Sequence, residues 1–317
     1  MTVPTTALIR SGPLLAAATF FAGTALAQEP GQFDVDPEAA ERALERALVQ
    51  TGSILLPAGA AEVAPYFSFQ RNESEVAGVP VLVGNQLVGT TIATDQNQAT
   101  AGVILRAGLP WAAQLDLNLP FTYQENSTEQ RVLGASLTND SQDSTGIGDV
   151  VLTYTQSLTG NDPDRPAFLA SVSYDSDTGD RENGLYLGTG FQEVELALTA
   201  TTRQDPLVFS VRVAYQHGFE NNHIQPGDQY SLAAGAFLAV NPQTSLQFGF
   251  TVAYTDDYQY QGRTVSGSDQ FAASLNLGIA TILRRNTLLD MAINVGLTED
   301  APDFAFVVSL PIRFNFR

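Results

Sequence analysis

The chain has 317 residues, 34 Asp+Glu against 15 Lys+Arg for a net charge of −19, and no cysteine. Phosphate repels such an acidic chain, which excludes nucleic-acid binding, and the absence of Cys excludes disulfide frameworks, Cys-based zinc sites and thiol catalysis. Charged residues make up only 15%, and beyond the N-terminus no run of about 20 apolar residues offers a membrane-spanning helix. Two classes remain, a soluble all-β protein and a membrane β-barrel.

Residues 1–27 have the pattern of a secretory signal peptide. Arg10 is the only charge before an apolar stretch at 14–22, and Ala25-Leu26-Ala27 presents small residues around a cleavage site before Gln28. We therefore expect an exported mature chain that begins near Gln28.

Residues 28–61 are expected to form a periplasmic or lumenal segment that contains a short helix. Asp36 suits the N-cap and Pro37 the first helical position, and Leu44 and Leu48 lie four residues apart on one face. At roughly 15 residues this helix is too short to be stable alone. Its partner is its own barrel domain, a symmetry mate in a coiled coil, or the inside of a pore that it plugs.

From Glu62 onward the hydrophobic period changes to two, as in strands. Large apolar residues alternate with Gly, Ala, Ser, Thr, Asn and Gln, a second face that suits the lumen of a barrel whose outside meets lipid. The pattern predicts an all-β fold, a twelve-stranded antiparallel transmembrane β-barrel over residues 62–317. Its strands are expected at 62–71, 99–109, 113–124, 147–158, 167–177, 190–203, 207–217, 229–240, 244–256, 268–283, 286–298 and 303–315.

The connections between these strands alternate in length. Short turns such as Gln204-Asp205-Pro206 alternate with long polar segments, of which 72–98 and 125–146 are the longest. Short periplasmic turns and long external loops are typical of bacterial outer-membrane barrels. An even strand number then places both termini in the periplasm.

The strand parity predicts which charged side chains face the lumen. These lumen-lining candidates are Arg106, Asp116, Glu193, Glu195, Arg212, Asp290 and Arg313. Hairpin geometry predicts three ion pairs, Arg106–Asp116, Arg212–Glu195 and Asp290–Arg313, with Glu193 left near the outer mouth. Such pairs predict a narrow pore with weak cation preference.

No catalytic, cofactor or metal site is expected from the sequence. A barrel lipase needs a His base beside a Ser nucleophile, but the stretch after His217 lacks the required Ser. The acidic stretch 175–182 lacks the spacing of a calcium loop.

The stretch ERALERALVQTGSILLPAGAAEVAPYFSF (41–69) and GIGDVVLTYTQSL (146–158) resemble outer-membrane transporters of the meta-pathway phenol-degradation type. The layout is also similar to the export channel of the bacterial functional-amyloid system. The resemblance implies a channel for small organic solutes, with aromatic compounds suggested by the family label. A secretion pore for an unfolded or amyloid-forming polypeptide and a structural or adhesive barrel are the alternatives.

The expected partners follow from this class of protein. They are outer-membrane lipid and lipopolysaccharide, the barrel assembly machinery, and further copies of the chain in a homo-oligomer such as a trimer.

Overall fold

The computed structural model describes residues 55–83, 86–132, 135–159, 166–182, 185–204, 206–241, 243–284 and 286–315, all within the compact unit Asp36–Arg317. The signal peptide predicted for 1–27 and the helix predicted within 28–61 lie outside these residues. No helix in the described ranges has the length and apolar character needed to cross a membrane.

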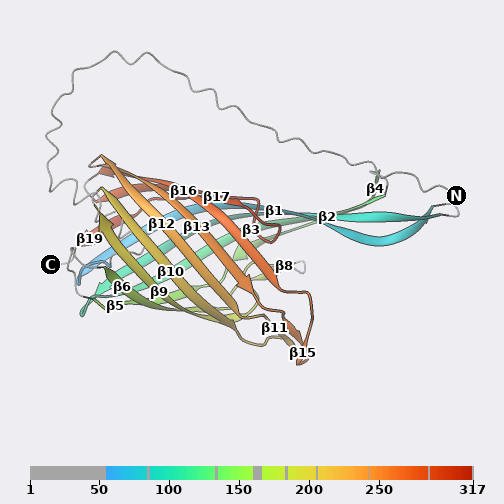
Figure 1. The fold of residues 1–317 in the computed structure, drawn as a ribbon, viewed down its shortest axis with the longest axis horizontal. Helices are drawn as coiled ribbons and strands as arrows, with labels where there is room; N and C mark the ends of the chain where they lie inside the picture. The colour runs from blue at the N-terminus through green and yellow to red at the C-terminus, as the bar shows by residue number, and fades with distance from the viewer. Residues whose placement is uncertain are drawn as a thin grey trace, which may run out of the picture. The chain divides into compact units, whose positions relative to one another are not determined.

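The described strands form an antiparallel sheet that closes on itself (Figure 1). The predicted twelve-stranded barrel is confirmed, because β1 pairs with β2 on one side and with β18 and β19 on the other. One barrel crossing is split into β4 and β5, and another into β18 and β19. The barrel strands are β1 (Ala60–Val83), β2 (Gln86–Leu109), β3 (Ala113–Val132), β4 (Ala135–Ile147), β5 (Val151–Ser157), β6 (Ala167–Ser176), β9 (Gln192–Gln204), β10 (Leu207–Gly218), β12 (Gln229–Asn241), β13 (Thr244–Thr255), β16 (Gln270–Arg284), β17 (Thr287–Gly296), β18 (Phe304–Ser309) and β19 (Ile312–Asn315).

Short connections join the strands at one end of the barrel, called here the turn end, and longer ones at the other, the loop end. Five two-residue strands lie in the loops of the second kind. They are β7 (Arg181–Glu182), β8 (Leu185–Tyr186), β11 (Ile224–Gln225), β14 (Gln259–Tyr260) and β15 (Arg263–Thr264).

The outer face of the barrel is apolar and exposed. Every barrel crossing contributes at least one large apolar side chain that is more than a third exposed, among them Phe67, Leu105, Phe121, Tyr154, Val172, Leu198, Val211, Leu232, Phe250, Leu277, Ile293 and Phe314. Successive strand residues point to opposite faces, so the small and polar residues between them face inward. The large apolar residues of each strand therefore point outward and the residues between them inward, which is the alternation predicted from the sequence.

The segments 72–98 and 125–146, predicted as loops, are strand extensions. β1 pairs with β2 as far as Val83↔Gln86, and β3 pairs with β4 as far as Val132↔Ala135. Figure 1 shows these two hairpins running beyond the loop end. Both faces of a strand in water can be polar, so hydrophobic alternation gives no signal there.

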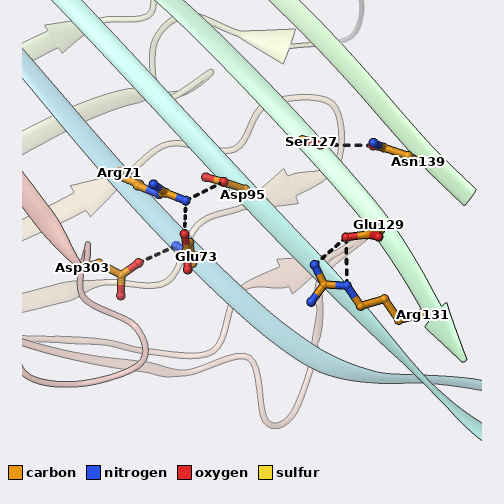
Figure 2. Close-up of polar contacts among 8 residues, drawn as sticks. All are labelled: Arg71, Glu73, Asp95, Ser127, Glu129, Arg131, Asn139 and Asp303. Carbon is orange, nitrogen blue, oxygen red and sulfur yellow. Dashed lines mark hydrogen bonds and ion pairs between the residues drawn. The ribbon is translucent and has the colours of Figure 1, made fainter. Parts of the chain in front are cut away.

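Charged pairs lie across this four-stranded extension (Figure 2). Arg71 contacts Glu73 on its own strand and Asp95 on the neighbouring strand, the latter at 2.9 Å. Arg131 contacts Glu129 at 2.5 Å, and hydrogen bonds from this guanidinium hold the pKa of the Glu129 carboxyl below its ordinary value. Asp303 accepts a 2.7 Å hydrogen bond from the Glu73 amide and so fastens the extension to the β17–β18 turn.

Closure of the barrel can be tested with engineered cysteines, because the chain has none of its own. Ser68 of β1 lies opposite Val307 of β18, within the roughly 4.4–6.8 Å that a disulfide bridges between Cα atoms. Oxidation of the S68C/V307C variant should link the first and last strands, seen by mass spectrometry of the digested protein. The S68C/F306C variant is the control, because its two side chains lie on opposite faces. Equal linking in both variants, or in neither, would contradict the closure.

Candidate functional site

The interior of the barrel encloses a cavity of about 310 Å3. Its lining comes from eight strands, from β3 round to β16, and consists mainly of Thr, Ser, Ala, Gly, Gln and Asn residues. Two predicted lumen residues, Asp116 and Arg212, also line it. The volume lies at the lower end of the range of roughly 300–1,000 Å3 found for small-molecule sites.

Arg212 and Glu195 form an ion pair inside the barrel, which confirms one predicted pair. The guanidinium meets both carboxylate oxygens, with Nη2–Oε1 at 2.6 Å and Nη1–Oε2 at 3.3 Å. Thr199 lies directly opposite Arg212 in the ladder, so the Arg side chain reaches along the neighbouring strand. A bidentate contact of this kind fixes the guanidinium plane.

A buried charge cluster lies at the turn end. The Glu62 carboxylate lies 2.7 Å from Arg106 Nη1 and 3.9 Å from Arg313 Nη2, and the residue is 2% exposed. Asp116 lies opposite Arg106 in the ladder, as predicted, but its carboxylate accepts hydrogen bonds from Gln114 Nε2 at 2.8 and 3.1 Å. Arg106 thus pairs with Glu62 in place of the predicted Asp116.

The chain just before β1 packs on the same part of the inner wall. The Leu56 amide donates a 2.8 Å hydrogen bond to Gln114 Oε1, and the Leu56 side chain is buried. The Gly59 amide donates to the Gly108 carbonyl at 3.2 Å. A Cβ on Gly108 would collide with the Pro57 carbonyl oxygen, so only glycine permits this close approach.

The predicted pair Asp290–Arg313 is wrong in register. Asp290 lies opposite Ser309, and Arg313 lies opposite Glu62, a shift of four positions (313 − 309). The turn closes earlier in the chain than predicted, because the Thr298 carbonyl accepts from the Ala301 amide at 3.1 Å. The shift is even, so the predicted facing of both residues is unaffected.

Residues 177–182 and 185–191, called here the inner loop, contact the inner wall at the loop end. The Asp149 carboxylate accepts hydrogen bonds from the Gly179 amide at 2.8 Å and from the Thr189 amide at 2.5 Å. Asp149 lies in the interruption between β4 and β5 and is 7% exposed. A Cβ on Gly188 would collide with this carboxylate, so the loop approaches it as closely as a backbone can.

A second carboxylate fastens the start of the inner loop. Asp180 Oδ2 accepts a 2.8 Å hydrogen bond from the Ile147 amide, and the Asp180 amide donates to the Ile147 carbonyl at 2.8 Å. Leu187 is 2% exposed, and its carbonyl lies near Gly148. The inner loop is therefore held to the wall by its own backbone and by two carboxylates.

Three residues of this interior were not among the predicted site residues. Phe67 is exposed on the outer face of β1, and Glu62 lies five residues before it. Strict alternation along the strand therefore places Glu62 on the inner face, and this signal could have identified it. Gln114 has the same inward parity as Asp116 on β3, but it is uncharged and so was not selected by a search for charged side chains. Asp149 lies outside the strands, and its partners are backbone amides of a distant loop. Glu193, predicted near the outer mouth, lies at the loop end, where its carboxylate accepts a 2.6 Å hydrogen bond from Gln216.

Removing the Glu62 carboxylate should destabilise the barrel strongly. Glu62→Ala leaves Arg106 without its buried counter-charge, which typically costs about 3–5 kcal/mol. Denaturant unfolding in lipid measures the change, with Glu129→Ala on the exposed extension as control, for which roughly 0–1 kcal/mol is expected. Equal effects of the two substitutions would contradict the importance of the buried cluster.

Solved structures similar to this chain include outer-membrane proteins. The COG4313 outer membrane channel from Pseudomonas putida F1 is 18% identical, with a TM-score of 0.62 over 82% of this chain and 97% of that chain. The translocator domain of the autotransporter NalP from Neisseria meningitidis (12% identity, 88% and 98% covered) has a TM-score of 0.47, and the P. putida toluene transporter TodX (9% identity, 83% and 92% covered) has one of 0.40. The first shows a shared barrel fold.

A family model extends this similarity to the sequence. It matches residues 83–314, from the tip of the first hairpin to the last strand, and therefore covers most of the chain. This chain belongs to the family described as "Putative MetA-pathway of phenol degradation".

Proposed function

We propose that the chain is an outer-membrane channel through which small organic solutes, aromatic compounds among them, pass passively. The observation that carries the proposal is a closed barrel that exposes apolar side chains on every crossing and holds a cavity lined mainly by small and polar residues. Exposed apolar surface of this extent is typical of a membrane-embedded face. The family description, which refers to phenol degradation, supports aromatic solutes.

The narrow interior favours this function over the alternatives. A cavity of about 310 Å3, with an inner loop held against the wall, suits one small solute better than an extended polypeptide. A purely structural or adhesive barrel has no use for an enclosed polar cavity. We propose a channel and not an enzyme.

The seven predicted residues, joined by Glu62, are proposed to line the permeation path. Three positive and five negative side chains then face the lumen, and pairs such as Arg212–Glu195 cancel much of this charge. Weak cation preference is the expected consequence.

The proposed orientation places both termini in the periplasm and the two long hairpins outside the cell. The even number of crossings supports it, as does the position of the long connections at one end. We further propose that 28–61 enters the lumen from the periplasm after signal cleavage, which the contacts of Leu56 and Gly59 with the inner wall support. Insertion by the barrel assembly machinery belongs to the same proposal.

Release of the inner loop should widen the channel. Asp149→Ala removes two charge-assisted hydrogen bonds, each worth about 1.5–3 kcal/mol, so the single-channel conductance in planar bilayers should rise above that of the unaltered protein. Asp140→Ala, on the exposed β4 extension, is the matched control and should leave conductance unchanged. A protein that forms no conducting channel, with or without Asp149, would refute the proposed function.

Embedding of the barrel in lipid can be tested on two adjacent residues of β17. Ile293 is 40% exposed on the outer face, whereas Asn294 points inward. Ile293→Arg should destabilise the protein by about 2–4 kcal/mol if the side chain meets the bilayer midplane, and Asn294→Arg should cost less. Unfolding in liposomes gives both free energies. Similar losses for the two variants would argue against a lipid-facing outer surface.

A further inference from the structure

A second pocket, of about 430 Å3, lies among the loops at the loop end. Its apolar lining is contributed by Tyr186, Phe191, Ile224, Pro226 and Tyr258, which come from three different connections. Tyr186, Ile224 and Tyr258 remain 36–39% exposed. Three aromatic rings around a concave volume of this size match the composition of a small-molecule site.

Specific contacts build this pocket from its separate loops. The Asn221 side chain donates hydrogen bonds to the Gly190 carbonyl at 2.8 Å and to Asp177 Oδ2 at 3.3 Å, joining two of the connections. Arg181 stacks on the Tyr186 ring at 4.4 Å from its centroid and fixes the ring plane.

Unusual backbone conformations also gather at the pocket. Asn222 and Gly190 both line it, and both have positive φ, 51° and 76°. A non-glycine residue in this region is uncommon, and such conformations cluster at ligand sites.

The charges around the pocket select against anions. Asp177 is hydrogen-bonded to the lining residue Asn221. Glu220 and Asp257 adjoin lining residues in the sequence, and Asp256 lies two residues before Tyr258. Two arginines accompany these four carboxylates. Arg181 lies against the ring of Tyr186, and Arg263 pairs with Tyr260 in the small sheet that contains the lining residue Ile224. An aromatic carboxylate therefore meets net repulsion within about one Debye length.

The inner loop contributes both to this pocket and to the contacts inside the barrel. Thr189 lines the pocket, and its amide donates to Asp149 in the interior. One short stretch of the inner loop thus forms part of the wall of the outer pocket and also contacts the inner wall of the barrel.

From these observations we propose that the loop end carries a capture site for an uncharged aromatic molecule, formed by Tyr186, Phe191 and Tyr258. The site rests on the proposed function, for which it names the class of solute and the place of first contact. The bound ring lies between aromatic side chains while the surrounding carboxylates exclude acids of the same shape.

Benzamide and benzoate test the proposal, because they share a ring and nearly the same shape but differ in charge. Equilibrium dialysis of each radiolabelled probe against the full chain in lipid nanodiscs gives the Kd, with empty nanodiscs correcting for partition into lipid. Benzamide should bind about tenfold or more tightly than benzoate, a difference of about 1.4 kcal/mol. Saturable benzamide binding is required.

Variants place the binding in the pocket. Tyr258→Ala and Phe191→Ala should weaken benzamide binding about tenfold, corresponding to about 1.4 kcal/mol, and Ile224→Trp should weaken it by filling the volume. Tyr254→Ala is the matched control, because Tyr254 is similarly exposed, at 41%, on the outer face of β13. An unchanged far-UV circular dichroism spectrum of each variant verifies its fold independently of binding and of conductance.

The outcomes separate this site from the proposed channel. A conducting protein that binds no benzamide beyond the empty nanodiscs, or loses binding equally in Tyr254→Ala, overturns the capture site and leaves the channel. Benzoate binding as tight as benzamide overturns the selection by charge. Pocket-dependent binding by a protein that does not conduct supports the site and refutes the channel.

Discussion

The backbone pairing between β1 and the last two strands is the constraint on which the rest of the structure depends. Because Tyr66 pairs with Ser309 and Glu62 with Arg313, the sheet has no edge within the barrel, and its backbone groups are satisfied by neighbouring strands. In a bilayer this is the one way for strands to cross without unpaired amides. Closure also limits the space inside the barrel, whose cavity is lined mainly by small and polar side chains.

The buried charges follow from that limited space. Glu62 lies between two arginines from different strands, and Glu195 holds the guanidinium of Arg212 in a bidentate contact. A carboxylate so far from water is tolerated only with such partners. The interior thus combines polarity with little uncompensated charge.

The fold could be predicted from the sequence because one physical signal, apolar side chains facing lipid, repeats in every crossing. The same signal is absent where both faces of a strand meet water. The continuation of β1 and β3 into long hairpins could therefore not be predicted from the two-residue hydrophobic period. Arg106 lies opposite Asp116 on β3, as predicted, but it also lies opposite Glu62 on β1. Strand counting does not decide which of the two carboxylates the guanidinium contacts. The predicted pairing of Asp290 with Arg313 depended on the position of a single turn. Residue counting misplaced this turn, so the predicted partner differs from the observed one, Ser309, by four positions.

Asp149 shows why the interior of such a barrel is hard to predict. The donors to its carboxylate are the backbone amides of Gly179 and Thr189, which lie 30 and 40 residues away. A backbone amide is present at nearly every residue, so the sequence does not mark these two. Packing of the inner loop therefore explains the residues Gly146-Ile147-Gly148-Asp149 at the start of the stretch 146–158, with Gly188 leaving room for the carboxylate.

Among the strands that the structure describes, β1 beyond Arg71 pairs with β2 alone and β4 pairs with β3 alone, which leaves the four-stranded extension with two edges. Free edges invite strands from neighbouring molecules, a particular hazard where many copies share one surface. On β1 the edge is interrupted by an irregularity between Gly78 and Val81 and by Pro80, which has no amide hydrogen to donate. On β4 the edge carries the acidic residue Asp140, whose charge disfavours pairing with the same edge of another copy. The extension is thus protected against sheet-to-sheet aggregation on both sides, by backbone chemistry on one and by like charge on the other.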